Sequence, residues 1–190
     1  MATILITPPS IEPVSVDDIK SSARVDDASL DAQITALIPA FRMAAEHETR
    51  RRLITQTVEL VLDAFPASHI DLMLPDAQSI TSIKYLDSAG VEQTLAGTVY
   101  QLDADSTPSR ALLKYGQSWP ATQDVPNAVR VRFPVGYGPA AADVPSNIRL
   151  WITAHVCQAL DNPGALDAQQ VKTLPYLDRL LDAERVWATA

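Results

Sequence analysis

The hydrophobic periodicity of the chain changes twice along its length, and this change constrains the fold more than any other feature. Before Arg50 and after Pro139, apolar residues recur at the spacing of an amphipathic helix. Between Leu53 and Gly138 they alternate with polar residues, which is typical of half-buried strands. The pattern therefore predicts an α+β fold in which a block of strands is inserted between helices.

We expect the 190 residues to form a single domain over residues 1–190, because this length suits one domain that carries an insertion. Residues 1–52 and 139–190 are expected to form a helical core, and residues 53–138 a β-rich insertion between the N-terminal and C-terminal helices.

Local signals mark where the first helix begins. Ser15 and Asp18 fit a capping box, and Val14 with Ile19 fits a hydrophobic staple. These signals predict a short helix that ends at about Ala23.

A second helix is expected after Asp26, Asp27 and Ser29, which offer caps. Pro39 falls inside its apolar pattern and predicts a kink, because proline lacks the N–H that would bond the carbonyl of Thr35. The expected buried stripe consists of Leu30, Ile34, Leu37, Phe41 and Ala45.

Helical spacing returns after Pro145-Ser146, and Asn162-Pro163-Gly164 is expected to stop this helix. Leu177, Leu180 and Leu181 mark a last short helix. The buried face of the longer helix is expected to hold Ile148, Ile152, Val156 and Ala159.

Period-2 alternation predicts seven strands in the central block. Asp87-Ser88-Ala89-Gly90 is expected to form a turn between two of them. The predicted strands are Ile54–Leu62, Ile70–Leu74, Ile80–Leu86, Val91–Leu95, Val99–Asp103, Ala111–Tyr115 and Ala128–Val135.

The segment at the end of this block combines a regular strand with dense turn chemistry. Val129, Val131, Phe133 and Val135 alternate with Arg130 and Arg132, so we expect a half-buried strand with a basic solvent face. Pro134 cannot donate to a ladder, which places the end of this strand at a sheet edge or a bulge and indicates an edge strand. Gly136 and Gly138 let the chain leave the sheet.

Composition narrows the class of protein. Hydrophobic residues make up 47% and charged residues 20%, which is typical of a folded globular chain and of neither disorder nor a membrane span. The N-terminal MATILITPPS lacks a basic region, so no signal peptide is expected. A single cysteine, Cys157, fits a reducing compartment. The net charge of −8 predicts no basic face that would bind the phosphates of DNA.

Several short motifs, taken in order, resemble the head–tail connector family of tailed phages and prophages, whose members are head-completion or adaptor proteins. Each motif alone is weak, but together they run along nearly the whole chain. The motifs are Ile6-Thr7-Pro8-Pro9, Leu53-Ile54-Thr55-Gln56-Thr57, Gly116-Gln117-Ser118-Trp119-Pro120, Asn127-Ala128-Val129 and Gly136-Tyr137-Gly138.

The resemblance implies a virion protein without enzymatic activity, made in the host bacterial cytoplasm and placed at the head–tail junction. It implies a ring of about a dozen copies that docks on the portal protein, continues the DNA channel without binding DNA specifically, and meets the next tail or stopper protein. The chain departs from the family pattern at Arg51-Arg52, where relatives often carry glycine before the arginine, so a left-handed glycine cap is not assured there.

Two sets of contact residues follow as hypotheses. The apolar C-terminal stripe either packs on the core of this chain or is kept for a partner. The resemblance favours the partner, because relatives use a C-terminal segment to enter the lower rim of the portal. It points here to Leu177, Leu180, Leu181, Arg185, Val186 and Trp187. The loops Asp103–Arg110 and Thr122–Pro126 are expected to face neighbouring subunits or the tail, because partner contacts concentrate on loops. The residues in question are Asp103, Asp105, Arg110, Trp119 and Asp124.

No residue pattern supports a metal, a cofactor or a catalytic centre. His47-Glu48 begins like a zincin helix but lacks the second histidine, and His155 and Cys157 fall on different faces of a helix. Asp103-Ala104-Asp105 is typical of a turn. Gly136-Tyr137-Gly138 is no phosphate loop, because no helix start follows at the required spacing.

Two other functions stay open at this point. Scattered Asp and His residues would allow a small hydrolase or nucleotide-handling enzyme. Arg50-Arg51-Arg52, together with Arg130 and Arg132, would allow a nucleic-acid-binding module, although three cations at a helix C-terminus also complement the helix dipole.

Overall fold

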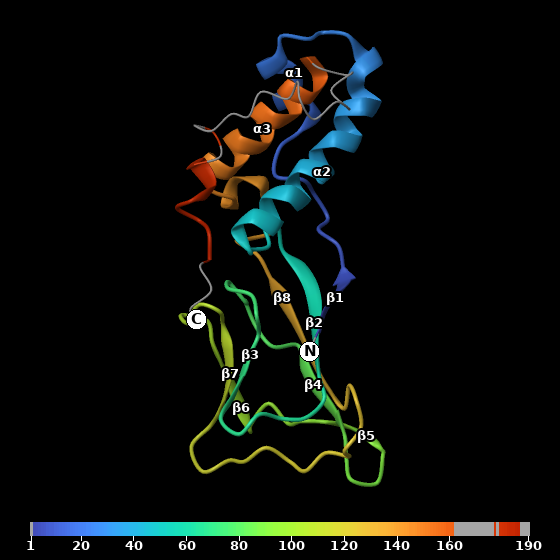
Figure 1. Ribbon diagram of the computed structural model, residues 1–190, viewed down its shortest axis with the longest axis vertical. Coiled ribbons are helices and arrows are strands. Elements are labelled where there is room, and N and C mark those ends of the chain that lie inside the picture. Colours follow the sequence, from blue (N-terminus) through green and yellow to red (C-terminus); the bar gives the residue numbers. More distant parts are fainter. Residues whose placement is uncertain (1, 162–176, 178, 187–190) are drawn as a thin grey trace, which may run out of the picture. The chain divides into compact units, whose positions relative to one another are not determined.

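Strands and helices fall into separate parts of the chain, which confirms the α+β class (Figure 1). The computed structural model describes residues 2–161, 177 and 179–186. Its internal contacts divide the chain into two units. We call Met1–Ser10 with Thr55–Tyr137 the β unit, and Ile11–Ile54 with Gly138–Ala190 the helical unit.

The β unit contains two antiparallel sheets (Figure 1). The larger sheet has the order β1-β2-β8-β4-β5, and the smaller has the order β3-β7-β6. The strands are β1 (Ala2–Thr7), β2 (Gln56–Leu62), β3 (His69–Asp71), β4 (Ser82–Leu86), β5 (Glu92–Thr94), β6 (Tyr100–Asp103), β7 (Arg110–Leu113) and β8 (Val129–Val135). All seven strands predicted between Ile54 and Val135 are confirmed, with ends shifted by a few residues.

The two sheets share one apolar core. Alternate residues of β2 and β8 point into it, so Val58, Leu60, Val131 and Phe133 are fully buried. The smaller sheet contributes Ile70 and Ala111, and Tyr85, Phe65 and Trp119 pack around the edge of this cluster. The other face of the larger sheet, which carries Glu59, Arg130 and Arg132, is its outer face.

The N-terminal residues differ from the sequence expectation. Residues 2–7 form β1, which pairs with β2 from Ala2↔Val61 to Thr7↔Thr57, with an irregularity between Leu5 and Thr7. Met1–Ser10 therefore belongs to the β unit, whereas residues 1–52 were assigned to a helical core. The β-branched residues of this segment favour a strand, but the strand with which it pairs lies more than fifty positions away in the chain.

β8 lies in the middle of the larger sheet, between β2 and β4, so the expectation of an edge strand is wrong. Pro134 is tolerated because β4 pairs only with residues Val129–Arg132 of β8. Beyond that point, Gln78 N–H donates to the carbonyl of Pro134 (3.0 Å). Gly136 then takes φ = 136°, a conformation that disfavours side chains, and this supports the predicted exit from the sheet.

The helical unit contains α1 (Val16–Ala23), η1 (Ala28–Leu30), α2 (Asp31–Thr49), η2 (Ala141–Asp143), α3 (Ser146–Asp161) and η3 (Arg179–Leu181). The predicted capping box is present, since Ser15 Oγ accepts from Asp18 N–H and Asp18 accepts from Ser15 N–H. Asp27 caps η1 rather than α2. The residues expected to stop α3 lie outside the described part of the chain.

The buried stripe of α2 is rotated relative to the prediction. Ile34 and Ala45 are fully buried as expected, but Leu30, Leu37 and Phe41 are only half-buried. The stripe instead continues through Ile38, Arg42, Glu46 and Thr49. α2 runs through Pro39, and its C-cap residue Arg50 takes the left-handed conformation (φ = 57°), which favours glycine.

Arg42 and Glu46 are tolerated inside because they form an ion network. Arg42 Nε bonds Glu12 Oε2 (2.8 Å), and Arg42 Nη1 lies 3.3 Å from Glu46 Oε1. Glu46 also accepts from Arg52 Nη1 (3.0 Å) and from the backbone N–H of Leu53 (3.1 Å). A buried charge needs such partners, and periodicity read from apolar residues alone does not reveal them.

Candidate assembly surfaces

The C-terminal residues predicted to bind a portal lie against the end of α2. Leu181 is fully buried in the helical unit, while Leu177 and Leu180 are half-buried. The carbonyl of Leu180 accepts from Asn147 Nδ2 on α3 (2.9 Å). Trp187 lies outside the described residues. Leu181 is therefore a core residue of this chain, and the other described members of the set are at least partly accessible.

Beyond η3 the chain is held mainly by hydrogen bonds to the last turn of α2. Arg185 Nε donates to the carbonyl of Glu48 (3.1 Å), and its Nη2 pairs with Glu48 Oε2 (2.9 Å). Val186 N–H donates to the carbonyl of Thr49 (3.0 Å). These bonds satisfy carbonyls that a helix end leaves open. The segment is docked through its backbone and Arg185, which leaves the side chain of Val186 half-buried.

The arginine run at the end of α2 is largely engaged within the helical unit. Arg51 Nε donates to the carbonyl of Glu184 (2.7 Å), and Arg52 Nη1 donates to the buried Glu46. Arg50 is exposed and occupies the left-handed cap position. Two of the three guanidinium groups thus hold the fold together, which weakens the case for this run as a DNA-binding site.

The loop residues predicted to contact other subunits separate into two groups, at the two ends of β8. Asp103 and Arg110 pair across β6 and β7, and Ser109 next to them donates to the carbonyl of Leu74 (3.1 Å). Ser109 Oγ also accepts from Ala77, which bridges to Val135 at the end of β8. We call this the crossover end of the β unit.

Asp124 lies at the opposite end, where β8 begins. Its neighbour Gln123 donates to the carbonyl of Leu86 (3.1 Å), and Leu86 N–H donates to the carbonyl of Ala128 (2.9 Å). We call this the turn end. A seven-residue strand spans about 23 Å at 3.3 Å per residue, so the two groups cannot form one contact site.

At the crossover end, the loop after β6 is locally ordered. Asp103 accepts from the hydroxyl of Ser106 (2.6 Å), and this hydrogen bond lowers the pKa of Asp103. Arg110 Nε pairs with Asp71 Oδ1 (3.0 Å) on β3. Asp105 is exposed. Asp105 is therefore the member of this group whose carboxylate is accessible to another protein.

At the turn end, Trp119 stacks on Phe65 with ring centroids 5.0 Å apart and planes nearly parallel. Tyr85 meets Phe65 edge-on at 5.6 Å. The stack lies beside an open hollow of about 510 Å³ whose lining includes Pro66 and Pro120. Sequence reasoning chose Trp119 but missed Phe65, because the two residues come from different loops.

The outer face of the larger sheet carries a second charge cluster. Glu59 is 6% exposed and accepts from Arg130 Nη1 (2.9 Å) and from Arg132 Nε and Nη2 (3.1 and 2.8 Å). Burial alone would raise the pKa of Glu59, but the hydrogen bonds from the two arginines outweigh it and lower that pKa. The predicted basic face is present, and the buried carboxylate of Glu59 holds its two arginines in place.

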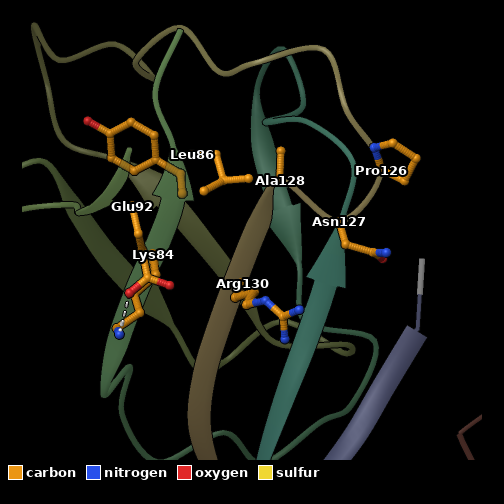
Figure 2. A pocket seen from close by; sticks show the side chains of 8 residues that line it. Lys84, Leu86, Glu92, Pro126, Asn127, Ala128 and Arg130 are labelled. Atoms are coloured by element: carbon orange, nitrogen blue, oxygen red, sulfur yellow. Dashed lines mark hydrogen bonds and ion pairs between the residues drawn. The ribbon is translucent and has the colours of Figure 1, made fainter. Parts of the chain in front are cut away.

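A hollow of about 400 Å³ lies on this face toward the turn end (Figure 2). Arg130 and Ala128 of β8 line it beside Pro126 and Asn127 of the preceding loop. On the β4–β5 hairpin, Lys84 Nζ pairs with Glu92 Oε1 (2.8 Å). The hollow is shallow and polar, which suits the side chains of a protein partner better than a small ligand.

The described residues hold no group of three or more His, Cys, Asp or Glu side chains that could bind a metal ion. His155 stacks on Trp151 with centroids 3.9 Å apart. Burial, followed by the charge of Asp161, raises the pKa of Cys157, so the thiol is not activated. In the same part of the chain, every helix is too short or too polar to cross a membrane.

Three solved structures share this fold over 100% of this chain and 98% of their own. The neck of an empty gene transfer agent (GTA) particle, computed with C6 symmetry, has a TM-score of 0.82 at 18% identity. The virion of a native GTA particle gives 0.81 at 19%, and the neck of a native GTA particle computed with C12 symmetry gives 0.76 at 20%. No protein-family model and no curated protein matches the chain. The resemblance drawn from the sequence motifs is thus confirmed at the level of the fold.

Proposed function

We propose that this protein is a structural head–tail adaptor of a tailed phage or phage-like particle. It forms a ring under the portal, continues the DNA channel toward the tail, and is part of the virion at the head–tail junction. The observation that carries the proposal is the likeness to chains from GTA necks and virions, which extends over the full length of both partners. A helical core with an inserted β unit is the arrangement we propose for each copy.

The charge distribution supports a conduit rather than a DNA-binding surface. The chain carries −8 overall, and a channel that DNA must leave freely should repel phosphates. Arg51 and Arg52 are engaged with Glu184 and Glu46, and Arg130 and Arg132 both bond Glu59. A nucleic-acid-binding module would need a larger excess of positive charge than Arg130 and Arg132 keep after Glu59 neutralises one of them, and no observation favours an enzyme.

We propose that the C-terminal segment binds the portal through Leu177, Leu180, Arg185, Val186 and Trp187. Leu181 belongs to the sequence-derived set too, but its burial gives it the role of anchoring this segment to the helical unit. The group at the crossover end (Asp103, Asp105 and Arg110) and the group at the turn end (Trp119 and Asp124) contact different neighbours, because they lie at opposite ends of β8.

The experiment that tests the proposal is electron microscopy of the purified chain mixed with the portal protein of the same particle. A ring of copies on the portal is the expected result, and its absence at micromolar concentrations of both proteins would refute the adaptor function. Measuring DNA binding against salt gives the second arm. A steep fall in DNA affinity with rising salt would favour the nucleic-acid module instead.

The loops are tested by shortening them separately. Removal of the tip of Asp103–Arg110 or of Thr122–Pro126 should leave the ring on the portal and block joining of the tail. A loop variant that no longer docks on the portal would place that loop at the portal rather than at the tail.

A further inference from the structure

β1 is an exposed edge strand with an unusual composition. All six of its residues are exposed, including Ile4 (45%), Leu5 (49%) and Ile6 (39%). Natural edge strands are normally protected by charges, by proline or by a bulge. β1 contains no charge and no proline, and its one irregularity comes after Leu5. Such an edge offers backbone groups and apolar side chains to another chain.

The register shows that both faces of this edge are apolar. Ile4 lies opposite Glu59, so its side chain lies on the outer face of the sheet. Leu5 lies opposite Val58, which points into the core between the sheets. Leu5 is nevertheless half exposed, because the core ends at β2 among the described residues. Leu5 therefore lies on the same face of the larger sheet as the buried core, but no described part of this chain covers it.

The outer face beside β1 differs in charge from the rest of the protein. On the nearest strands, β2 and β8, it carries Arg130 and Arg132 against Glu59, a net charge of +1 in a chain whose total is −8. The arginine side chains are 45% and 42% exposed. A surface of this sign fits an acidic partner, and the remainder of a second copy of this chain is strongly acidic.

We propose that β1 and the adjoining outer face form the lateral contact between one copy and the next in the ring, with extended backbone of the neighbour adding to β1. This inference rests on the proposed adaptor function. Strand addition supplies main-chain hydrogen bonds, Ile4 and Leu5 supply apolar burial, and Arg130 and Arg132 face acidic groups of the neighbour.

The size of the surface also fits a repeated ring contact better than a tight pair. Adding one six-residue strand buries less than the roughly 1,200 Å² that stable interfaces need, so two copies alone should associate weakly. Closure of a ring gives every copy two such contacts and adds the portal as a template, which raises the effective concentration of neighbours.

The test compares Ile4→Lys with Val91→Lys, both in the β unit, mixed with the portal protein of the same particle. Val91 is 54% exposed and lies at the β4–β5 turn, away from β1. Lysine at Ile4 places a desolvated charge at every proposed contact, and we expect ring formation to weaken at least about tenfold. Val91→Lys should assemble like the natural chain, and both variants should keep its melting temperature within a few degrees.

A measurement on the natural chain removes the dependence on any variant. Hydrogen exchange should slow at the amides of residues 2–6 when the free chain assembles into the ring. Rings formed equally well by Ile4→Lys, or β1 amides that exchange equally fast in the ring and in the free chain, would overturn this inference and leave the adaptor function intact. If the natural chain forms no ring at all, the adaptor function fails, and this inference fails with it.

Discussion

Truncation of the C-terminal segment separates its contribution to the fold from its contribution to binding. Deleting Asp182–Ala190 removes at least four hydrogen bonds that residues 184–186 make with the end of α2 and with Arg51. A hydrogen bond contributes about 1 kcal/mol net to stability, so these bonds together contribute about 4 kcal/mol. This figure alone would suggest that truncation greatly lowers the free energy of unfolding.

Conformational entropy offsets that contribution in full. Ordering the backbone of residues 182–186 costs about 1–2 kcal/mol per residue, or about 5–10 kcal/mol in total, and some burial of Val186 recovers part of it. The carbonyls of Glu48 and Thr49 become accessible to water after truncation, so they are not left without partners. We therefore expect the truncated chain to lose at most about 1–2 kcal/mol of its free energy of unfolding, which at about 2–4 °C per kcal/mol is a fall in melting temperature of no more than about 8 °C.

Leu181→Ala provides the contrast. Leu181 is 1% exposed, and replacing a buried leucine with alanine costs roughly 2–5 kcal/mol, which corresponds to a fall of about 10 °C. Scanning calorimetry of both variants measures the two effects, and co-sedimentation with the portal protein measures binding. The truncated chain should lose portal binding while keeping its fold, and Leu181→Ala should melt lower.

The opposite order of melting temperatures would refute this reasoning. If the truncated chain melts many degrees below the natural chain, residues 182–190 are part of the core and any loss of portal binding is a consequence of unfolding. If it melts normally and still binds the portal, the binding residues lie elsewhere.

Three further predictions follow from single residues. Glu59→Gln should make the free energy of unfolding less dependent on pH in acid, which urea titrations near pH 7 and about pH 3 would detect. The reason is that the pKa of Glu59 is lowered in the folded chain. Its contribution to stability is therefore complete above about pH 4.3 and is lost as pH falls through the lower folded value. Gly136→Ala should cost at least about 1 kcal/mol because of its positive φ, while Gly97→Ala, in open space with an ordinary φ, should cost less in the same titration. Arg50→Gly should stabilise the chain by about 1 kcal/mol or less by relieving the left-handed cap, and a lower urea midpoint would contradict this explanation.

Local patterns in the sequence were sufficient for most of the secondary structure. The capping box at Ser15 and Asp18 is a short-range signal, because both partners lie within one helical turn. The alternation from Val129 to Val135 likewise predicts which side chains of β8 are buried, since the pleat of a strand places them on opposite faces.

Long-range pairing explains what the sequence did not reveal. The neighbours of β8, the pairing of β1 with β2 and the stack of Phe65 on Trp119 each join residues far apart in the chain, and nothing in a local pattern specifies the partner. Burial of Glu59 is similar, because this charged residue enters the interior only where Arg130 and Arg132 of another strand meet it.

Some features of the candidate surfaces follow from the sequence, and others follow only from the tertiary structure. Sequence alone determined an α+β chain with helices on both sides of a strand block, and an apolar C-terminal stripe that includes Leu181. Only the tertiary structure decided that Leu181 is a core residue, that the two loops proposed as contacts lie at opposite ends of β8, and that β1 is left with an open apolar edge. The physical reason is that propensity and periodicity act within a few residues, whereas exposure depends on which distant segments cover a surface.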